Sequence, residues 1–190
     1  MSIETRRARI PTFPALETER LILRELTDAD GPWYLVQFSR PETMDGQGYP
    51  APPNLEAAIA EMHEFGVDLL ERGAGVRWAW CRKADPTVVI GSGTLLDWED
   101  EPESRAEIGY SLVPDAWGQG FATEALREIH RFAFEVMSLD RIEAFVFTDN
   151  QRSLAVLERL GYTKDELLPA HFEDAHGVLR DEWRLSIGRP

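Results

Sequence analysis

The amino-acid sequence predicts an α/β fold in which a mixed sheet lies between two layers of helices, and three observations support this. Residues 76–113 contain apolar or alternating runs separated by turns, as an antiparallel meander does. Residues 121–136 repeat apolar side chains at helical spacing. A strand-like segment, a short helical segment and a final strand then follow. Strands that first form a meander and then alternate with helices predict three layers.

The length and charge of the chain limit its class. A chain of 190 residues fits one domain with a substantial core. The formal net charge of −14 argues against a nucleic-acid partner, because neutralising phosphates requires a clustered basic surface. The lone Cys81 excludes an internal disulfide and fits a reducing compartment. Since no apolar run is long enough for a membrane span and no signal peptide is evident, we expect a cytoplasmic protein without a membrane partner.

The first fifteen residues differ in composition from the rest of the chain. They contain three arginines and two prolines, and a short basic segment of this kind is more often a tail than a binding element. We therefore expect a flexible arm over residues 1–15 and a single domain over residues 16–190.

The predicted elements follow from local signals. Alternation of apolar and polar residues predicts strands, and N-cap side chains predict helix starts, as at Thr27 and Asn150. Gly161 predicts a helix end, and the proline- and glycine-rich residues 40–53 predict a loop. The predicted strands are residues 20–26, 76–82, 87–98, 105–113, 141–148 and 181–187, and the predicted helices are residues 27–38, 54–72, 121–136 and 150–160.

The stretch "DAWGQGFATEAL", residues 115–126, places two glycines where a helix begins. The phosphate loop of nucleotide hydrolases requires Gly-Lys-Ser/Thr, which the sequence lacks. The fingerprint of dinucleotide-binding folds is a closer match. Gly118, Gly120 and Thr123 occupy its three positions, with Thr123 in place of the last Gly or Ala, and Asp140 follows about 20 residues later. In that fingerprint the first glycine follows its strand directly, whereas here several residues intervene after an antiparallel meander, so this interpretation remains a remote alternative.

A phosphate cradle of another kind fits the stretch better. The first amide N–H groups of a helix have no acceptor within the helix, and the helix dipole favours an anion there. Gly118, Gly120 and Ala122 leave little side chain to obstruct a pyrophosphate. The stretch therefore predicts a binding site for a phosphate-bearing ligand.

The run "AEIGYSLVPDAWGQGFATEALREIHRFAFE" resembles the acetyl-coenzyme A binding segment of the GNAT N-acetyltransferase superfamily, in particular its branch of ribosomal-protein-alanine N-acetyltransferases (RimJ/RimL-like). Gly120 and Ala122 match the last two positions of the superfamily pattern, while Trp117 replaces its Gln or Arg. Three further segments resemble the branch in the correct order: "LETERLILRELTDAD", "TDNQRSLAVLERLGY" and "GVLRDEWRLS". The resemblance covers most of the chain from Leu16, except residues 40–76 and the acidic hairpin.

The resemblance implies a GNAT-type α/β/α sandwich whose mainly antiparallel sheet splays at the coenzyme cleft. It implies acetyl-coenzyme A as cosubstrate, no metal, and a pantetheine arm that pairs with the strand at Leu112 and Val113. An amide near Val113 would polarise the thioester carbonyl, and Pro114 would keep Val113 extended. The residues implied to bind the coenzyme are Leu112, Val113, Trp117, Gly118, Gln119, Gly120, Ala122, Thr123, Asn150 and Ser153.

Acetyl transfer to an amine needs one group that takes a proton from the amine and another that donates to the departing thiolate. Glu107, on the strand before the glycines, is the candidate base, and its alternative is a solvated strand carboxylate. Relatives outside the branch use a tyrosine of this helix as the donor, but the matching position in this sequence is Leu157. Ser153, in the same helix, is therefore the candidate donor. The alternative for Ser153 is helix capping beside Asn150.

Other chemistry-bearing residues have simpler interpretations. Cys81 lies in a strand without a local base, so we expect packing rather than nucleophilic catalysis. His171 and His176 lack a second ligand pair with metal-site spacing, so we expect a solvated loop and no metal. Trp78 and Trp80 share one strand face and are expected in the core rather than around a cation. An acidic cluster is expected at a solvated hairpin tip: Asp97, Glu99, Asp100, Glu101 and Glu103.

The sequence thus predicts an acetyl-coenzyme A dependent N-acetyltransferase that acts by direct transfer in a ternary complex. The alternatives are a non-catalytic acyl-coenzyme A sensor of the same fold and, remotely, a dinucleotide-dependent oxidoreductase. The amine acceptor stays open between a protein N-terminus, a polyamine and a small molecule. Residues 40–53, the second helix and the loop at His171 should frame it. The resemblance also leaves a homodimer open.

Overall fold

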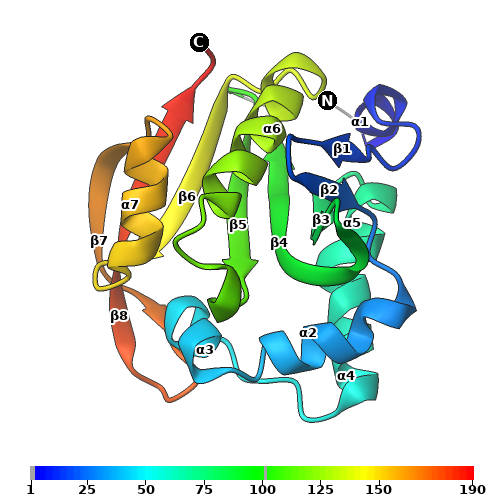
Figure 1. The fold of residues 1–190 in the computed structure, drawn as a ribbon. Coiled ribbons are helices and arrows are strands. Elements are labelled where there is room, and N and C mark those ends of the chain that lie inside the picture. The colour runs from blue at the N-terminus through cyan, green and yellow to red at the C-terminus, as the bar shows by residue number, and fades with distance from the viewer. Residues whose placement is uncertain (1–2, 101) are drawn as a thin grey trace.

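The computed structural model describes residues 3–100 and 102–190, and its centre is one sheet of eight strands (Figure 1). The strand order is β1-β2-β3-β4-β5-β6-β8-β7, and only β5 and β6 are parallel neighbours. The strands are β1 (Leu16–Glu17), β2 (Leu21–Arg24), β3 (Val76–Arg82), β4 (Asp85–Glu99), β5 (Arg105–Leu112), β6 (Arg141–Phe147), β7 (Thr163–Glu173) and β8 (Leu179–Gly188). The helices are α1 (Ile3–Arg9), α2 (Gly31–Gln37), α3 (Pro41–Gln47), α4 (Leu55–Met62), α5 (Asp68–Glu71), α6 (Phe121–Glu135) and α7 (Gln151–Arg159).

A hydrophobic core lies on each face of the sheet, because side chains alternate along each strand. Trp78 and Trp80 of β3 are fully buried in the core that includes α6 and α7, as predicted for core residues. Ala79 and Cys81, between and beside them, belong to the core that includes α2 and α4. Helices therefore cover both faces of a mainly antiparallel sheet, which confirms the predicted three-layer fold.

The N-terminal segment is packed, which differs from the flexible arm predicted for residues 1–15. Ile10, directly after α1, is only 4% exposed and joins the main core. Phe13 lies edge-on to Trp78 with ring centroids 6.4 Å apart, and Arg6 Nε donates to Asp100 Oδ2 at 2.6 Å. Isolated apolar residues among arginines and prolines give no periodic signal, so the sequence pattern missed this packing. The two residues before α1 lie outside the described residues.

Two other segments differ from the predicted elements. Residues 40–53 contain the short helix α3, because Pro41 suits a first helical position and Gly48, with φ of +72°, suits a helix end. The prolines and glycines of residues 40–53 predict a loop, and the structure instead contains this helix. Strand β7 was not predicted, because nearly all of its side chains are exposed and no alternation marks it. Its pairing with β8 holds it in the sheet.

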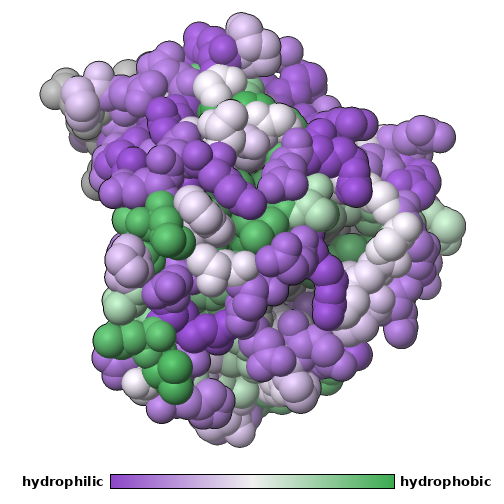
Figure 2. Space-filling model, turned by 90° about the vertical axis from the view of Figure 1, so that its left-hand side faces the viewer, coloured by the Kyte–Doolittle hydropathy of each residue, from purple (hydrophilic) through white to green (hydrophobic). Residues whose placement is uncertain are grey.

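The side of the molecule that carries β7 is mostly hydrophilic, with apolar groups only in separate patches (Figure 2). Leu167 of β7 and Leu179 of β8 are among the exposed apolar residues. No helix in the described part of the chain combines the length and the apolar character needed to cross a membrane.

Candidate active site

Strands β5 and β6 separate after a short paired segment. They pair in parallel only from Arg105 to Glu107, which faces Glu143. Strand β5 then continues to Leu112 and β6 to Phe147 without further pairing between them. Backbone groups on the facing edges are therefore open to pairing with an extended ligand. This opening corresponds to the splay that the family resemblance implied.

The ladder between β4 and β5 decides which amide groups of β5 face the opening. The resemblance implied a donor amide near Val113, and the Val113 N–H itself donates to the Ile90 carbonyl at 2.8 Å, so it is not free to polarise a thioester. Backbone groups alternate in direction along a strand, so the Leu112 N–H points to the other edge, toward the opening. The Leu112 carbonyl on that edge accepts from Trp117 Nε1 at 2.8 Å. Leu112 therefore offers the donor that was expected near Val113.

The glycine loop joins β5 to α6 through a short 3-10 turn, Pro114–Ala116. Gly118 and Gly120 have φ of +71° and +81°, a conformation that residues with a Cβ rarely adopt. No described atom lies within 4 Å of a Cβ placed on Gly118, so the loop is open there. Helical bonding in α6 begins with Glu124 N donating to Gly120 O at 3.0 Å, which leaves the amides of residues 121–123 without a helical acceptor. A pyrophosphate fits these donors.

Charged side chains fix this loop to the turn between β1 and β2. The carboxylate of Glu124, in the first turn of α6, accepts from Thr18 Oγ1 at 2.5 Å and from Arg20 Nε at 2.6 Å. Arg20 Nη1 also donates to the Gln119 carbonyl at 3.0 Å, and the Gln119 side chain donates to the Asp115 carbonyl at 2.7 Å. The loop is thus held in shape from within the chain, and the side chain of Gln119, expected to bind the coenzyme, contributes to the loop itself.

Glu107 lies at the point where β5 and β6 separate. Burial, together with the negative charges of Asp97, Glu182 and Glu143, raises the pKa of Glu107 to about 7, while His171 acts in the opposite direction. A carboxyl group that ionises near pH 7 is suited to take a proton from an ammonium group. This environment differs from that of a solvated strand carboxylate, the alternative interpretation of Glu107.

A bulge in β4 brings a further carboxylate toward Glu107. The register between β4 and β5 shifts between Leu96 and Glu99, and Asp97 within the bulge has φ of +51°. Bulges re-aim side chains next to functional sites. Asp97, predicted at a solvated hairpin tip, is exposed but near enough to act on Glu107. Glu101, from the same predicted tip, lies outside the described residues.

Two segments predicted to frame the acceptor lie together beside these carboxylates. The Ala175 N–H, in the turn after β7, donates to the Gly48 carbonyl at 2.7 Å. The Tyr49 ring meets Phe172 edge-on with centroids 5.2 Å apart. Partial burial and the charges of Glu107, Glu182 and Asp97 raise the pKa of Tyr49. Helix α4, from the second predicted helix, packs with α2 in the core on the face of the sheet opposite α6.

Ser153 lies in the first turn of α7, where its amide donates to Asn150 Oδ1 at 3.2 Å, so Asn150 is the N-cap as predicted. Its hydroxyl lies 2.9 Å from the hydroxyl of Tyr110 on β5. Burial raises the pKa of Tyr110 to about 12, although the hydrogen bond with Ser153 acts in the opposite direction. The phenol therefore stays protonated at neutral pH. Tyr110 was missed from the sequence, although alternation along "RAEIGYSL" places it on the face opposite Glu107.

The remaining candidates lie as follows. Burial raises the pKa of the Cys81 thiol, which makes it a poor nucleophile. His171 Nδ1 lies 2.7 Å from Glu182 Oε2, and its ring stacks on Phe145. Among residues 3–100 and 102–190, no group of three or more His, Cys, Asp or Glu is arranged to hold a metal ion. Thr123 is 8% exposed in the first turn of α6, beside Ala122.

Comparison with known sequences agrees with this geometry. Residues 20–163 match the family described as acetyltransferase (GNAT) domain. The chain is 35% identical over 180 residues to the uncharacterized N-acetyltransferase YoaA of Bacillus subtilis, with 94% of this chain and 98% of that protein covered. It is 34% identical over 203 residues to the FsC-acetyl coenzyme A-N(2)-transacetylase of Aspergillus fumigatus, with 95% and 82% covered.

Solved structures share the fold. Mycobacterium smegmatis RimJ in complex with CoA-disulfide matches with a TM-score of 0.80 at 19% identity, over 92% of this chain and 86% of that one. Spermidine N-acetyltransferase from Vibrio cholerae in complex with CoA and spermine matches with a TM-score of 0.76 at 19% identity, over 88% and 95%. The chain therefore belongs to the GNAT family of acetyltransferases, and it is an acetyl-coenzyme A dependent N-acetyltransferase.

Proposed function

We propose that this protein transfers the acetyl group directly to a primary amine in a ternary complex, with Glu107 as base and Ser153 as donor to the leaving sulfur. One observation carries the proposal. Glu107, with a pKa of about 7, and the hydrogen-bonded pair Tyr110 and Ser153 lie on opposite sides of β5, next to the opening between β5 and β6. A base and a proton donor thus meet at one strand edge.

The residues of the glycine loop fit the coenzyme. The amides of residues 121–123 and the open space at Gly118 would take its pyrophosphate, and the free edge of β5 at Leu112 would pair with the pantetheine arm. Trp117, which already bonds the Leu112 carbonyl, and Asn150 at the start of α7 would line this path. When bound, acetyl-coenzyme A supplies the acetyl thioester.

Glu107 prepares the acceptor. A primary amine of the lysine type has a pKa of about 10.4, so at neutral pH it is protonated and not nucleophilic. The Glu107 carboxylate takes a proton from the ammonium group, directly or through a water molecule, and frees the nitrogen lone pair. Asp97 and Glu182, whose charges act on Glu107, also favour the approach of a cation.

Leu112 and Ser153 act on the acyl donor. The Leu112 N–H donates to the thioester carbonyl oxygen, where negative charge grows as the nitrogen attacks. As the new C–N bond forms and the C–S bond breaks, the nitrogen loses its second proton to water, and the Ser153 hydroxyl donates a hydrogen bond to the sulfur that leaves as a thiolate. The Tyr110 hydroxyl, 2.9 Å from Ser153 Oγ, orients the serine for this role.

The acceptor is proposed only as a primary amine. Tyr49, Phe172 and the turn after β7 surround the side from which it would reach Glu107. A protein N-terminus, a polyamine and a small molecule all carry the required group. We further propose that residues 16–190 act as one domain in the cytoplasm. Sedimentation at micromolar concentration distinguishes a monomer from the homodimer that the resemblance leaves open.

A screen of acetyl transfer tests the proposal. The wild-type protein is incubated with acetyl-coenzyme A and separate pools of N-terminal peptides, polyamines and small amines, and acetylated products are identified by mass. The variant carrying Glu107→Gln and Ser153→Ala serves as the matched control and should lose turnover. If the wild type binds acetyl-coenzyme A but acetylates nothing in any pool, the protein is a non-catalytic acyl-coenzyme A sensor instead.

A further inference from the structure

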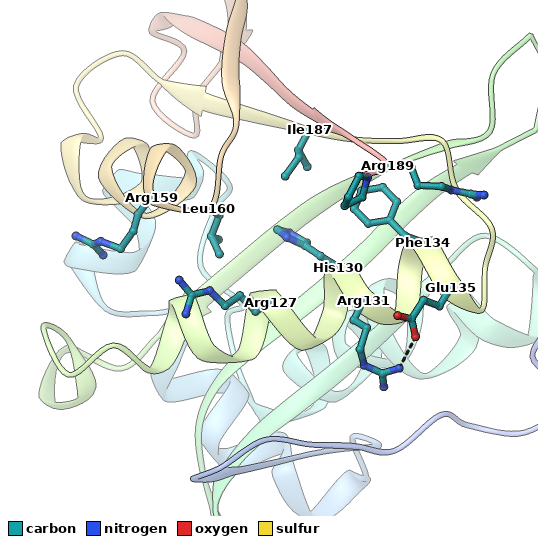
Figure 3. Close-up of a pocket in the computed structure, with 10 residues that line it drawn as sticks. Arg127, His130, Arg131, Phe134, Glu135, Arg159, Leu160, Ile187 and Arg189 are labelled. Atoms are coloured by element: carbon teal, nitrogen blue, oxygen red, sulfur yellow. Dashed lines mark hydrogen bonds and ion pairs between the residues drawn. The ribbon is translucent and has the colours of Figure 1, made fainter.

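The four histidines of the chain differ in their surroundings. His63 is partly exposed in the segment after α4, and His176 is exposed in the turn between β7 and β8. His130 extends from α6 (Figure 3), which packs against the face of the sheet opposite Glu107. His171 is the histidine whose charge acts on Glu107, the proposed base. It therefore belongs to the acceptor side of the enzyme.

Pairing across the sheet places His171 over the face that carries Glu107. Glu107 pairs with Glu143 on β6, and Phe145, two residues farther along β6, points to the same face of the sheet. The His171 ring stacks on Phe145, with centroids 5.7 Å apart and planes at 15°. Beyond Glu143, strand β6 forms one edge of the opening between β5 and β6. The imidazole thus lies beside this opening, on the side from which the acceptor would reach Glu107.

His171 lies in a bulge of β7. The pairing of β7 with β8 changes register within residues 168–172, and Ala170 has φ of +50°. The Ala170 N–H donates to Asp181 Oδ1 at 2.8 Å, which fixes the bulge to β8. Asp97 lies in a comparable bulge of β4. Irregularities in two separate strands therefore direct a polar side chain toward the proposed base.

Glu182 orients the imidazole. Its Oε2 lies 2.7 Å from His171 Nδ1, and because a carboxylate accepts, the proton of the neutral ring is on Nδ1. Nε2 then has a free lone pair, and within residues 3–100 and 102–190 no hydrogen bond ends on it. The Glu182 side chain is 9% exposed, whereas that of His171 is 48% exposed. The pair thus combines a buried carboxylate with an imidazole that reaches solvent.

We propose that His171, oriented by Glu182, receives through a water molecule the second proton that the acceptor nitrogen loses during acetyl transfer. The inference rests on the proposed function, in which Glu107 takes the first proton. Attack on the thioester carbonyl leaves the nitrogen with one proton more than a neutral amide carries. That proton passes to the water, which gives a proton to Nε2 as the C–S bond breaks and the thiolate leaves. The imidazolium forms beside the Glu182 carboxylate and later returns its proton to solvent.

Single-turnover acetylation, with the amine that is acetylated fastest in the screen above, tests the inference. His171→Ala should lower the rate at saturating amine about 100-fold and leave the half-saturating amine concentration within about twofold of the wild type. Added imidazole should raise the rate of this variant about tenfold, because it can accept the proton in place of the missing ring. His171→Asn can keep a hydrogen bond to Glu182 but has no second nitrogen that accepts a proton, so it should be as slow as His171→Ala.

The tautomer of His171 gives a readout that needs no turnover. At a pH where the ring is neutral, ¹⁵N chemical shifts should show a protonated Nδ1 and an unprotonated Nε2, with the signals assigned by their loss in His171→Ala. Glu182→Gln should weaken this preference, because an amide can also donate to Nδ1. A wild-type ring with the proton on Nε2 would overturn the inference, because that nitrogen could not accept another.

His63→Ala is the matched control, because His63 Nε2 also lies 2.7 Å from a carboxylate oxygen, that of Asp28. It should leave the rate unchanged, with or without imidazole. A wild-type rate in either His171 variant, or a loss in His171→Ala that imidazole does not reverse, would overturn the inference and leave the proposed transfer intact. If the wild type acetylates no amine, the proposed function fails and the inference fails with it.

Discussion

The Tyr110 hydroxyl lies 2.9 Å from the Ser153 hydroxyl and connects the middle of β5 to the first turn of α7. The Tyr110 ring stacks on Trp80, which is fully buried, so the core holds the phenol in place from the side away from the helix. A serine hydroxyl can accept one hydrogen bond while donating another. Tyr110 can therefore occupy the acceptor capacity of Ser153 and leave the serine proton for a ligand.

The first prediction concerns this pair. Ser153→Ala should lower kcat about 100-fold, because a positioned proton donor contributes on that order, and should change the Kd for coenzyme A little. Tyr110→Phe should lower kcat about tenfold while retaining the ring packing. The double variant should be close to Ser153→Ala alone, since both changes remove one interaction. Fully additive losses measured in single-turnover experiments would show that Tyr110 acts independently of Ser153.

The second prediction concerns the pH dependence of Glu107. Because its pKa is about 7, kcat/KM should rise as pH increases through 7 and then level off. Glu107→Gln should lower activity at least 100-fold and remove this ionisation from the profile. The measurement is a pH profile from about 5.5 to 9. An unchanged profile in the variant would exclude Glu107 as the base.

The third prediction concerns stability and follows from the raised pKa of Glu107. The folded-state pKa of Glu107 lies above the unfolded value, so between about pH 4.5 and 7 the folded protein binds the extra proton. The stabilisation that this proton uptake gives the folded state is complete below about pH 4.5 and is lost as pH rises through 7. Glu107→Gln should therefore be more stable than the wild type at pH 8 by roughly 2–3 kcal/mol in urea unfolding, with a smaller gain at pH 5. Equal gains at both pH values would contradict the shift.

A fourth prediction concerns the glycine loop. Gly120→Ala should cost about 1 kcal/mol of unfolding free energy, because φ at this position is +81°. Gly118→Ala should cost a similar amount through φ alone, since nothing described crowds its Cβ, and it should also weaken coenzyme A binding. Gly109→Ala on β5 is the control for stability, because its φ is not positive and its Cβ would meet only Leu96 at 3.9 Å. An equal cost at Gly109 would contradict the assignment to φ.

The fifth prediction concerns a buried histidine. His130 Nε2 lies 3.0 Å from the Tyr162 hydroxyl, and burial lowers the pKa of His130 to about 4. The unfolded chain therefore binds more protons between about pH 6.5 and 4, so this contribution to stability is lost as pH falls through that window, up to roughly 3 kcal/mol. His130→Gln should show a flatter loss between pH 7 and 4.5 in urea unfolding. An unchanged slope would show that His130 is not responsible.

The glycine loop and the cap of α7 could be predicted from the sequence because their signals are local. Positive φ at Gly118 and Gly120 and the cap at Asn150 each depend on residues adjacent in the chain. The remaining features depend on distant pairing. That Leu112 rather than Val113 faces the opening is decided by the bond from Val113 to Ile90, on another strand. No local pattern contains this information.

On the acceptor side, too, several features depend on pairing between distant segments and could not be predicted from local sequence. Asp97 reaches the neighbourhood of Glu107 through a bulge, and a bulge depends on the mismatch between two strands rather than on one of them. The contact between Gly48 and Ala175 joins segments more than a hundred residues apart. Strand β7 was missed because it is held by backbone pairing with β8 while its side chains are exposed.

Strand β5 carries the proposed base, Glu107, and the residue that orients the proposed donor Ser153, Tyr110. One position is odd and the other even, so the two side chains lie on opposite faces of the strand. One inserted or deleted residue between them would turn Tyr110 to the side of the acceptor and leave Ser153 without its partner. Between these positions the strand can change length only by an even number of residues, unless a bulge restores the alternation. The spacing along the sequence between the proposed base and the tyrosine that orients the proposed donor is therefore a constraint on how this enzyme can diverge, whatever amine it acetylates.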